Sequence, residues 1–203
     1  MNAEMLKTLF ALSLRNPREA AELIVGMKLP TQALWLALSL VSVLTSLVFS
    51  SLLHAAPMPQ DDVGQMIMSS PGYDSPLIFA LMQWGRAVLS VFVLYWVGKS
   101  MGGLGTLGDV LAVITWLQMV TFTLIAGLFA VGFIFPFVST IGMLVVLGWW
   151  LWAVVSFLDV AHRFGSPFKA FGVLIVSILG VLLGITVIMG VILSLFAGIT
   201  GGP

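Results

Sequence analysis

Residues 110–158 read VLAVITWLQMVTFTLIAGLFAVGFIFPFVSTIGMLVVLGWWLWAVVSFL, a 49-residue stretch without a single Asp, Glu, Lys or Arg. One membrane-spanning helix needs about 20 consecutive apolar residues, so this stretch has room for two spans and a tight turn. Gly132 and Pro136 lie near its middle, and these residue types mark turns between helices. The stretch therefore predicts a helical hairpin within a membrane.

The composition of the whole chain indicates the same environment. Hydrophobic residues make up 60% of the 203 residues and charged residues 8%, whereas soluble domains have about 45–50% and about 25%. So few charges cannot cover the surface of a soluble globule. Eight basic residues balance eight acidic ones, and Cys is absent, which excludes a nucleic-acid-binding protein and a disulfide-rich secreted scaffold.

Three further stretches predict one span each: residues 29–60, residues 75–98, in which Arg86 is the one charged residue, and residues 170–203. The last is too short for two spans and a turn, so it predicts one long, tilted helix. The expected fold class is all-α, a polytopic membrane protein built as a five-transmembrane-helix bundle with short N-terminal amphipathic helices. The spans are expected near residues 31–53, 77–98, 107–130, 136–158 and 168–197.

Helix-start signals support these boundaries. Thr106 and Asp109 have the spacing of a capping box at the start of the third span, in which each residue satisfies a backbone N–H of the other. Ser75 and Ser166 each precede a proline, which predicts an N-cap hydroxyl with proline at the first helical position.

The first 30 residues predict an interfacial segment. Charges recur through them, so a secretory signal peptide is not expected. Leu6 and Leu9 belong to one apolar face, and Asn16 and Glu19 have the spacing of a capping box for a second amphipathic helix. We therefore expect a cytoplasmic amphipathic segment over residues 1–30, lying in the interface or packed under the bundle, and a five-helix transmembrane domain over residues 31–203.

The distribution of basic residues predicts the orientation. With a cytoplasmic N-terminus, the cytoplasmic segments contain seven Lys or Arg and the external segments contain none, as the positive-inside rule requires. The C-terminus is then expected outside. The seven residues are Lys7, Arg15, Arg18, Lys28, Lys99, Arg163 and Lys169.

Arg86 is the one basic residue within a predicted span. It lies near the middle of the second span, where a charge costs about 2.5 to 3.5 kcal/mol, and no Asp or Glu is expected at that depth. Gln83 and Gln118 are the polar side chains expected beside it, Gln118 from another helix. Two interpretations remain open: an anion site for a headgroup or substrate, or an arginine that is buried against polar groups or extends to the interface.

A second polar cluster is expected at the cytoplasmic end of the fourth span. Asp159 and Arg163 are four residues apart and predict an ion pair on one helical face. His162 and Lys169 complete the cluster. Such residues commonly anchor a helix at the headgroups, and a role in binding a partner or a lipid is the alternative.

Small residues predict close contacts between helices, because they let helix backbones approach in a membrane. Ser42, Ser46 and Ser50 recur on the first span, and Gly180 and Gly184 share one face of the last. We expect both faces inside the bundle. A contact between two copies of the chain would use the same pattern.

No motif predicts catalysis. Residues 103–108 match the string G-x-G-x-x-G, but a membrane helix precedes them where a nucleotide site would have a strand. His54 and His162 fall on opposite sides of the membrane, so no catalytic or metal-ligating group can form from them. The sequence predicts no enzyme activity, no cofactor and no metal.

Three groups of residues resemble the Yip (Ypt/Rab GTPase-interacting protein) domain family, in its compact bacterial branch. They are Asn16-Pro17 before an amphipathic helix, Gly102-Gly103-Leu104-Gly105-Thr106 after the second span, and a third group formed by Trp152, Phe157, Leu158, Asp159, His162, Phe164, Pro167, Lys169 and Ala170. The resemblance implies a five-helix bundle with a cytoplasmic N-terminus in a bacterial inner membrane. Eukaryotic members are associated with small GTPases and vesicle traffic, but their Asp-Leu-Tyr-Gly-Pro string is absent here, so that activity is not carried over.

Two functions agree with these observations. The first is a non-enzymatic scaffold, assembly factor or accessory subunit that associates laterally with a larger membrane complex. The alternative is a small transport or lipid-handling protein that uses Arg86 as an anion site. The expected partners are membrane lipids and other integral membrane proteins, with no nucleic acid.

Overall fold

The computed structural model describes the backbone of residues 3–55 and 60–200, and the side chains of these residues up to Val187. Within these residues the chain forms helices and no strand. In chain order the helices are α1 (Ala3–Arg15), α2 (Pro17–Gly26), α3 (Thr31–Ala55), α4 (Asp62–Met68), α5 (Pro71–Asp74), α6 (Pro76–Ser100), α7 (Leu107–Gly132), α8 (Pro136–His162) and α9 (Pro167–Thr200).

Five of these helices are long and apolar enough to cross a membrane. They are α3, α6, α7, α8 and the part of α9 whose side chains are described, Pro167–Val187. Each begins and ends within a few residues of its predicted bounds. The predicted all-α class and the five spans are therefore confirmed.

Local signals account for several helix starts. The Asp109 backbone N–H donates to Thr106 Oγ1 over 3.2 Å and the Thr106 backbone N–H donates to Asp109 Oδ2 over 3.0 Å, so the predicted capping box opens α7. At the start of α2, Asn16 Oδ1 accepts from the Glu19 backbone N–H over 3.4 Å. Ser75 differs from the expectation, because its hydroxyl makes no capping hydrogen bond at the start of α6. The fixed φ of Pro76 already favours the first helical turn there.

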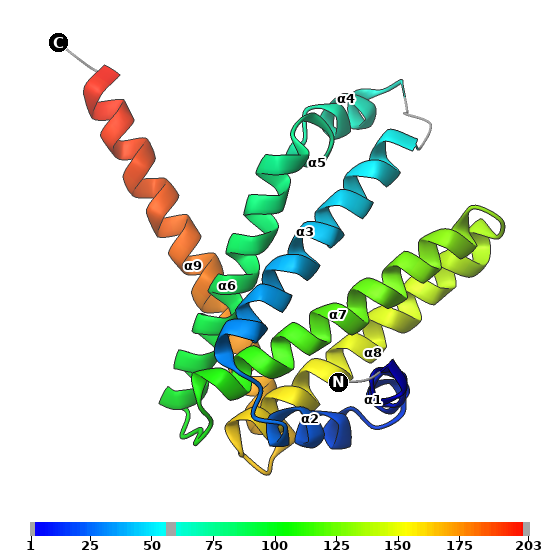
Figure 1. The fold of residues 1–203 in the computed structure, drawn as a ribbon. Coiled ribbons are helices and arrows are strands. Elements are labelled where there is room, and N and C mark those ends of the chain that lie inside the picture. The colour runs from blue at the N-terminus through cyan, green and yellow to red at the C-terminus, as the bar shows by residue number, and fades with distance from the viewer. Residues whose placement is uncertain (1–2, 56–59, 201–203) are drawn as a thin grey trace.

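The spans form two pairs and a fifth helix, α9, whose first part packs on α6 and α8 (Figure 1). Helix α3 packs along α6, and α7 packs along α8. The two pairs meet at one end of the molecule and diverge toward the other, while α9 leans away from both (Figure 1). The C-termini of α6 and α8 and the N-termini of α3, α7 and α9 lie at the meeting end.

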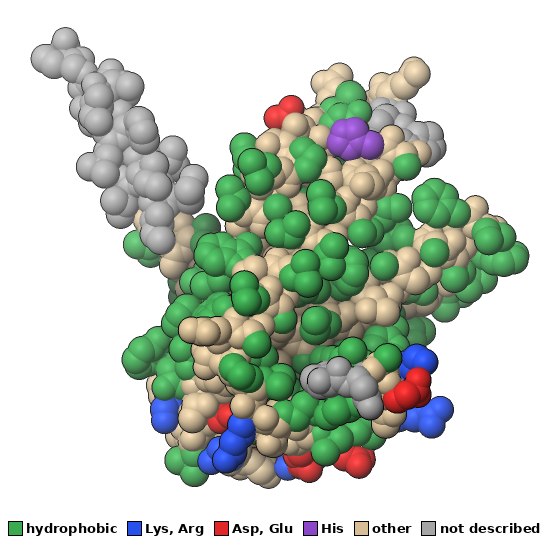
Figure 2. Space-filling view, in the orientation of Figure 1, with side chains coloured by type: hydrophobic (Ala, Val, Ile, Leu, Met, Phe, Trp, Pro, Cys, Tyr) green, Lys and Arg blue, Asp and Glu red, His purple; other side chains and the backbone are tan. Residues whose placement is uncertain are grey.

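The meeting end is named the basic end, because Lys28, Lys99, Arg163 and Lys169 lie at the helix ends that converge there. On the face shown in Figure 2, Lys and Arg side chains gather at this end. The other end, which carries α4, α5 and the turn between α7 and α8, is named the opposite end. Helix α2 packs on α7 and α8 at the basic end.

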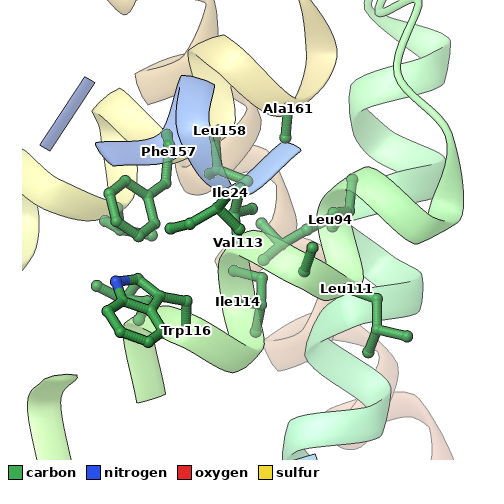
Figure 3. Close-up of a cluster of buried hydrophobic side chains, with 14 of the residues drawn as sticks. Ile24, Leu94, Leu111, Val113, Ile114, Trp116, Phe157, Leu158 and Ala161 are labelled. Atoms are coloured by element: carbon green, nitrogen blue, oxygen red, sulfur yellow. The ribbon is translucent and has the colours of Figure 1, made fainter. Parts of the chain in front are cut away.

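The buried core also lies toward the basic end. In α7 the buried side chains run from Val110 to Val120, and in α8 they begin only at Ala153. Figure 3 shows Ile24 of α2 and Leu94 of α6 packed among side chains of α7 and α8. The core therefore includes only the half of the α7–α8 hairpin that lies toward the basic end.

The small residues of the first span lie inside the bundle. Ser42, Ser46 and Ser50 are buried on α3. The Ser46 hydroxyl donates to the Pro76 carbonyl oxygen over 3.2 Å, which joins α3 to the start of α6. Small side chains on this face allow the two helices to approach closely.

The expected packing of Gly180 and Gly184 inside the bundle is wrong. A Cβ atom built on either glycine meets no other described atom within 4 Å. The reason is the direction of α9, whose last buried side chain among the described residues is Ser177. Beyond that residue the helix has left α6 and α8 (Figure 1), so the glycines meet no helix of the same chain.

Candidate functional site

Asp159 is a buried acid at the end of α8, and its side chain is fully shielded from solvent. Its Oδ2 accepts a hydrogen bond from the Arg18 guanidinium of α2. Its Oδ1 accepts from the Ser166 backbone N–H over 2.8 Å, in the turn before α9. Because a buried carboxylate needs partners for its charge, Asp159 ties α8 to α2 and to the start of α9.

The predicted ion pair between Asp159 and Arg163 is wrong. That pair requires the helix to continue through Arg163, but α8 ends at His162 and Arg163 has a left-handed backbone with φ of 57°. Its guanidinium Nη2 instead lies 3.7 Å from Asp109 Oδ2 at the start of α7. The true partner of Asp159 is Arg18, which sequence spacing cannot reveal because the two residues are 141 positions apart.

His162 lies fully buried where α6 crosses α8. Its Nδ1 donates to the Leu158 carbonyl oxygen over 3.1 Å, and its ring stacks on Phe164 with centroids 5.2 Å apart. Its Nε2 points at Gly98 of α6, where an added Cβ atom would lie 1.9 Å away. Gly98 therefore has to lack a side chain for α6 to pass over the histidine.

The turn between α6 and α7 contains Gly102, Gly103 and Gly105 and is named the glycine turn. It contacts the end of α8. The Leu104 backbone N–H donates to the His162 carbonyl oxygen over 2.9 Å. A Cβ atom at Gly105 would lie 1.9 Å from the Ala161 carbonyl oxygen, and one at Gly103 would lie 2.7 Å from the His162 ring. Gly103 and Gly105 thus permit backbone contact with α8. This contact accounts for these two glycines of the G-x-G-x-x-G string without a nucleotide site.

Helix α1 is held by two tryptophans. Trp116 Nε1 of α7 donates to Ser13 Oγ over 2.8 Å, and Trp149 Nε1 of α8 donates to the Ser13 carbonyl oxygen over 3.3 Å. Ser13 is itself buried. Sequence reasoning missed this contact, because a serine in an amphipathic helix carries no signal of its own.

Arg86 lies apart from the basic end, on the surface of α6. Its side chain is exposed, and its Nε donates to Gln83 Oε1 over 3.0 Å. Gln118 is half-buried on α7, and no hydrogen bond joins it to Arg86 within the described part of the chain. Lys169 is exposed in the first turn of α9 and belongs to the basic end only by position.

A model of the Yip1 domain matches residues 11–189, nearly the whole chain. The chain belongs to the Yip1 family. No curated protein and no solved structure shows a significant match to it. The matched region begins within α1 and ends within α9.

The three sequence groups that resemble the Yip1 family meet in space. Asn16 opens α2, the glycine turn contacts α8, and Asp159 and His162 belong to the end of α8 that both elements touch. In this member of the Yip1 family the start of α2, the glycine turn and the end of α8 therefore lie in one packed region. Among the residues described, no group of three or more His, Cys, Asp or Glu side chains has the arrangement of a metal site.

Proposed function

We propose that this Yip1-family protein is a non-enzymatic integral membrane protein that associates laterally with a larger membrane complex, as a scaffold, assembly factor or accessory subunit. The main support is the position of Arg86. It lies ten residues into the 25-residue helix α6, about 15 Å along its axis at 1.5 Å per residue. Its depth therefore corresponds to the interior of a bilayer about 30 Å thick.

An exposed charge at this depth requires compensation from outside its own helix. A guanidinium has five N–H donors, and Gln83 accepts from one of them. The described residues provide no acidic partner, since no ion pair of Arg86 is among those that the structure shows. A carboxylate or carbonyl oxygen from a neighbouring membrane protein would satisfy the remaining donors.

The far half of α9 supplies a second surface of the kind that lateral association uses. Gly180 and Gly184 are exposed and meet open space. In a membrane, glycines four residues apart allow a partner helix to approach the backbone closely. This surface fits another membrane helix, from a different protein or from a second copy of the chain.

The alternative function is transport or lipid handling with Arg86 as an anion site. The same exposed guanidinium favours it, because Gln83 is neutral and leaves the positive charge available to an anion. A lipid phosphate would then replace the partner carboxylate.

We propose that the protein lies in a bacterial inner membrane with the basic end in the cytoplasm. The convergence of Lys28, Lys99, Arg163 and Lys169 at one end supports this orientation, because basic residues are enriched on the cytoplasmic side. The external side would then carry α4 and α5, with Asp61, Asp62 and Asp74.

The test compares Arg86→Leu with Arg15→Leu, an exposed arginine of α1 outside the spans. Both variants are purified in mild detergent, and bound proteins and lipids are identified by mass spectrometry. Loss of a stoichiometric protein in Arg86→Leu alone supports lateral association. Loss of a bound lipid alone supports the alternative, and identical proteins and lipids in both variants would contradict both functions.

A further inference from the structure

A cavity of about 290 Å³ lies at the basic end, between α2, the start of α7 and the turn after α8. Its polar wall contains Lys28, Arg163 and Asp109, and its apolar wall contains Leu29, Leu34 and Ala112. Lys28 and Arg163 are both exposed, so the basic side chains lie where the cavity meets the surface. The site is separate from Arg86 and from the surface of α9.

The two basic residues share an unusual backbone conformation. Among the described residues, Lys28 and Arg163 are the non-glycine residues with positive φ, at 45° and 57°. Side chains with a Cβ atom rarely adopt this region, and residues held in it cluster at ligand sites. Here the left-handed residues follow α2 and α8 and bring two cations to one cavity from distant parts of the chain.

The charges of the cavity do not cancel. Asp109 Oδ2 lies 3.7 Å from Arg163 Nη2, and the same oxygen accepts from the Thr106 backbone N–H. Lys28 has no ion pair among the described residues. One positive charge therefore remains at the cavity without a counter-charge from the part of the chain that the structure describes.

The uncompensated positive charge favours an anion in the cavity, and the backbone at the start of α7 favours one as well. Gly108 lines the cavity in the first turn of the helix, where backbone N–H groups have no helical acceptor. A Cβ atom at Gly108 would meet only Thr106 Oγ1, at 3.7 Å. The bare backbone is therefore open to a ligand beside Lys28 and Arg163.

We propose that this cavity binds the phosphate group of an anionic phospholipid. Lys28 and Arg163 would hold the phosphate by charge-assisted hydrogen bonds. Leu34 belongs to the first turn of the span α3 and Ala112 to the second turn of the span α7, so the apolar wall continues toward the acyl-chain region. Ligand cavities have volumes of about 300–1,000 Å³, and one at the lower bound accommodates a headgroup whose chains remain in the bilayer.

The test uses the full chain in mild detergent and native mass spectrometry with added phosphatidylglycerol. The double variant Lys28→Gln/Arg163→Gln is expected to weaken phosphatidylglycerol binding by about tenfold or more, or roughly 1.4 kcal/mol. The control Lys99→Gln/Lys169→Gln removes two exposed basic residues of the same end that do not line the cavity. It is expected to change binding less than about threefold, because neither lysine lines the cavity that would hold the phosphate. Equal losses in both variants would overturn the proposal.

A second variant tests the cavity without changing its charge. A Cβ atom at position 108 makes only an ordinary van der Waals contact with Thr106 Oγ1, so Gly108→Leu should keep the melting temperature in detergent while phosphatidylglycerol binding falls. Wild-type binding by Gly108→Leu would overturn the proposal even if the double variant fails to fold. Glycerol phosphate tests the source of the phosphate: no competition at millimolar concentration supports the lipid, and full displacement of phosphatidylglycerol would overturn the lipid assignment in favour of a soluble phosphate.

Discussion

The basic end and the opposite end are built from the same helices but differ in how those helices meet. At the basic end, α2, the glycine turn and the starts of α7 and α9 close around the end of α8. At the opposite end the helix pairs diverge (Figure 1), and large apolar side chains such as Leu144 and Val145 of α8 are exposed. The comparison indicates that one end holds the fold together and the other is left for lipid or a partner.

Hydrophobicity does not produce this difference. The two halves of the α7–α8 hairpin belong to one uncharged stretch, yet only Val110–Val120 of α7 and Ala153–His162 of α8 contribute buried residues. The basic end instead combines close-approach glycines with a buried acid and its partners. Specific polar and backbone contacts therefore decide which half becomes a core.

The largest predicted effect is that of Arg18→Ala. This change leaves the fully buried Asp159 carboxylate without its cation. Breaking a buried pair by removing one partner costs about 3–5 kcal/mol, and because Arg18 is half-exposed we expect about 3 kcal/mol. The free energy of unfolding in detergent measures it, with Arg15→Ala as the control, because Arg15 is exposed and has no ion pair among the described residues. Equal stability of the two variants would show that the Asp159 contact does not stabilise the basic end.

A pair of glycine substitutions compares the two ends directly. Gly105→Ala places a Cβ atom against the Ala161 backbone at the basic end, so overpacking should lower stability by about 1–3 kcal/mol. Gly127→Ala lies in the far half of α7, where a Cβ atom meets nothing within 4 Å. It should raise stability by about 0.5–1 kcal/mol, because alanine favours a helix over glycine. Thermal unfolding of both variants checks the pair, and losses of the same size would refute the asymmetry.

The smallest effect on stability is expected for Gly180→Leu/Gly184→Leu. Both positions meet open space in the part of α9 beyond its last buried side chain, Ser177. Helix stability in a segment without tertiary contacts contributes little to cooperative unfolding, so the change in the free energy of unfolding should stay within about 0.5 kcal/mol. Cross-linking in native membranes should nevertheless lose products that involve α9, because leucine prevents close approach of a partner helix. A marked drop in the detergent melting temperature would mean that these glycines pack inside the bundle after all.

Local signals in the sequence predicted much of the fold. The gaps between charged residues located five spans, and the capping box of Thr106 and Asp109 located the start of α7. Both signals come from residues that lie close together in the sequence. The glycines after the second span and the residues around Asp159 also indicated the family.

The contacts of the candidate site depend on tertiary structure and were not predictable in the same way. Arg163 was expected to pair with Asp159 because the helix was assumed to continue, whereas the chain turns at Arg163. Arg18 reaches Asp159 from 141 residues away. Gly180 and Gly184 have the spacing of a helix-packing motif, but they meet no other described helix. The spacing within one helix does not predict which helix packs against it, or whether that helix belongs to the same chain.

The divergence of α6 and α9 is measured most directly by the distance between spin labels at each end. The natural chain contains no cysteine, so labels can be attached at introduced cysteines alone. One pair, Ser100→Cys and Phe168→Cys, reports on the basic end, and a second, Leu77→Cys and Val187→Cys, reports on the opposite end. All four positions are exposed. The account predicts a short, narrow distance distribution for the first pair and a clearly longer one for the second, while equal distances at both ends, as in a parallel-sided bundle, would contradict it.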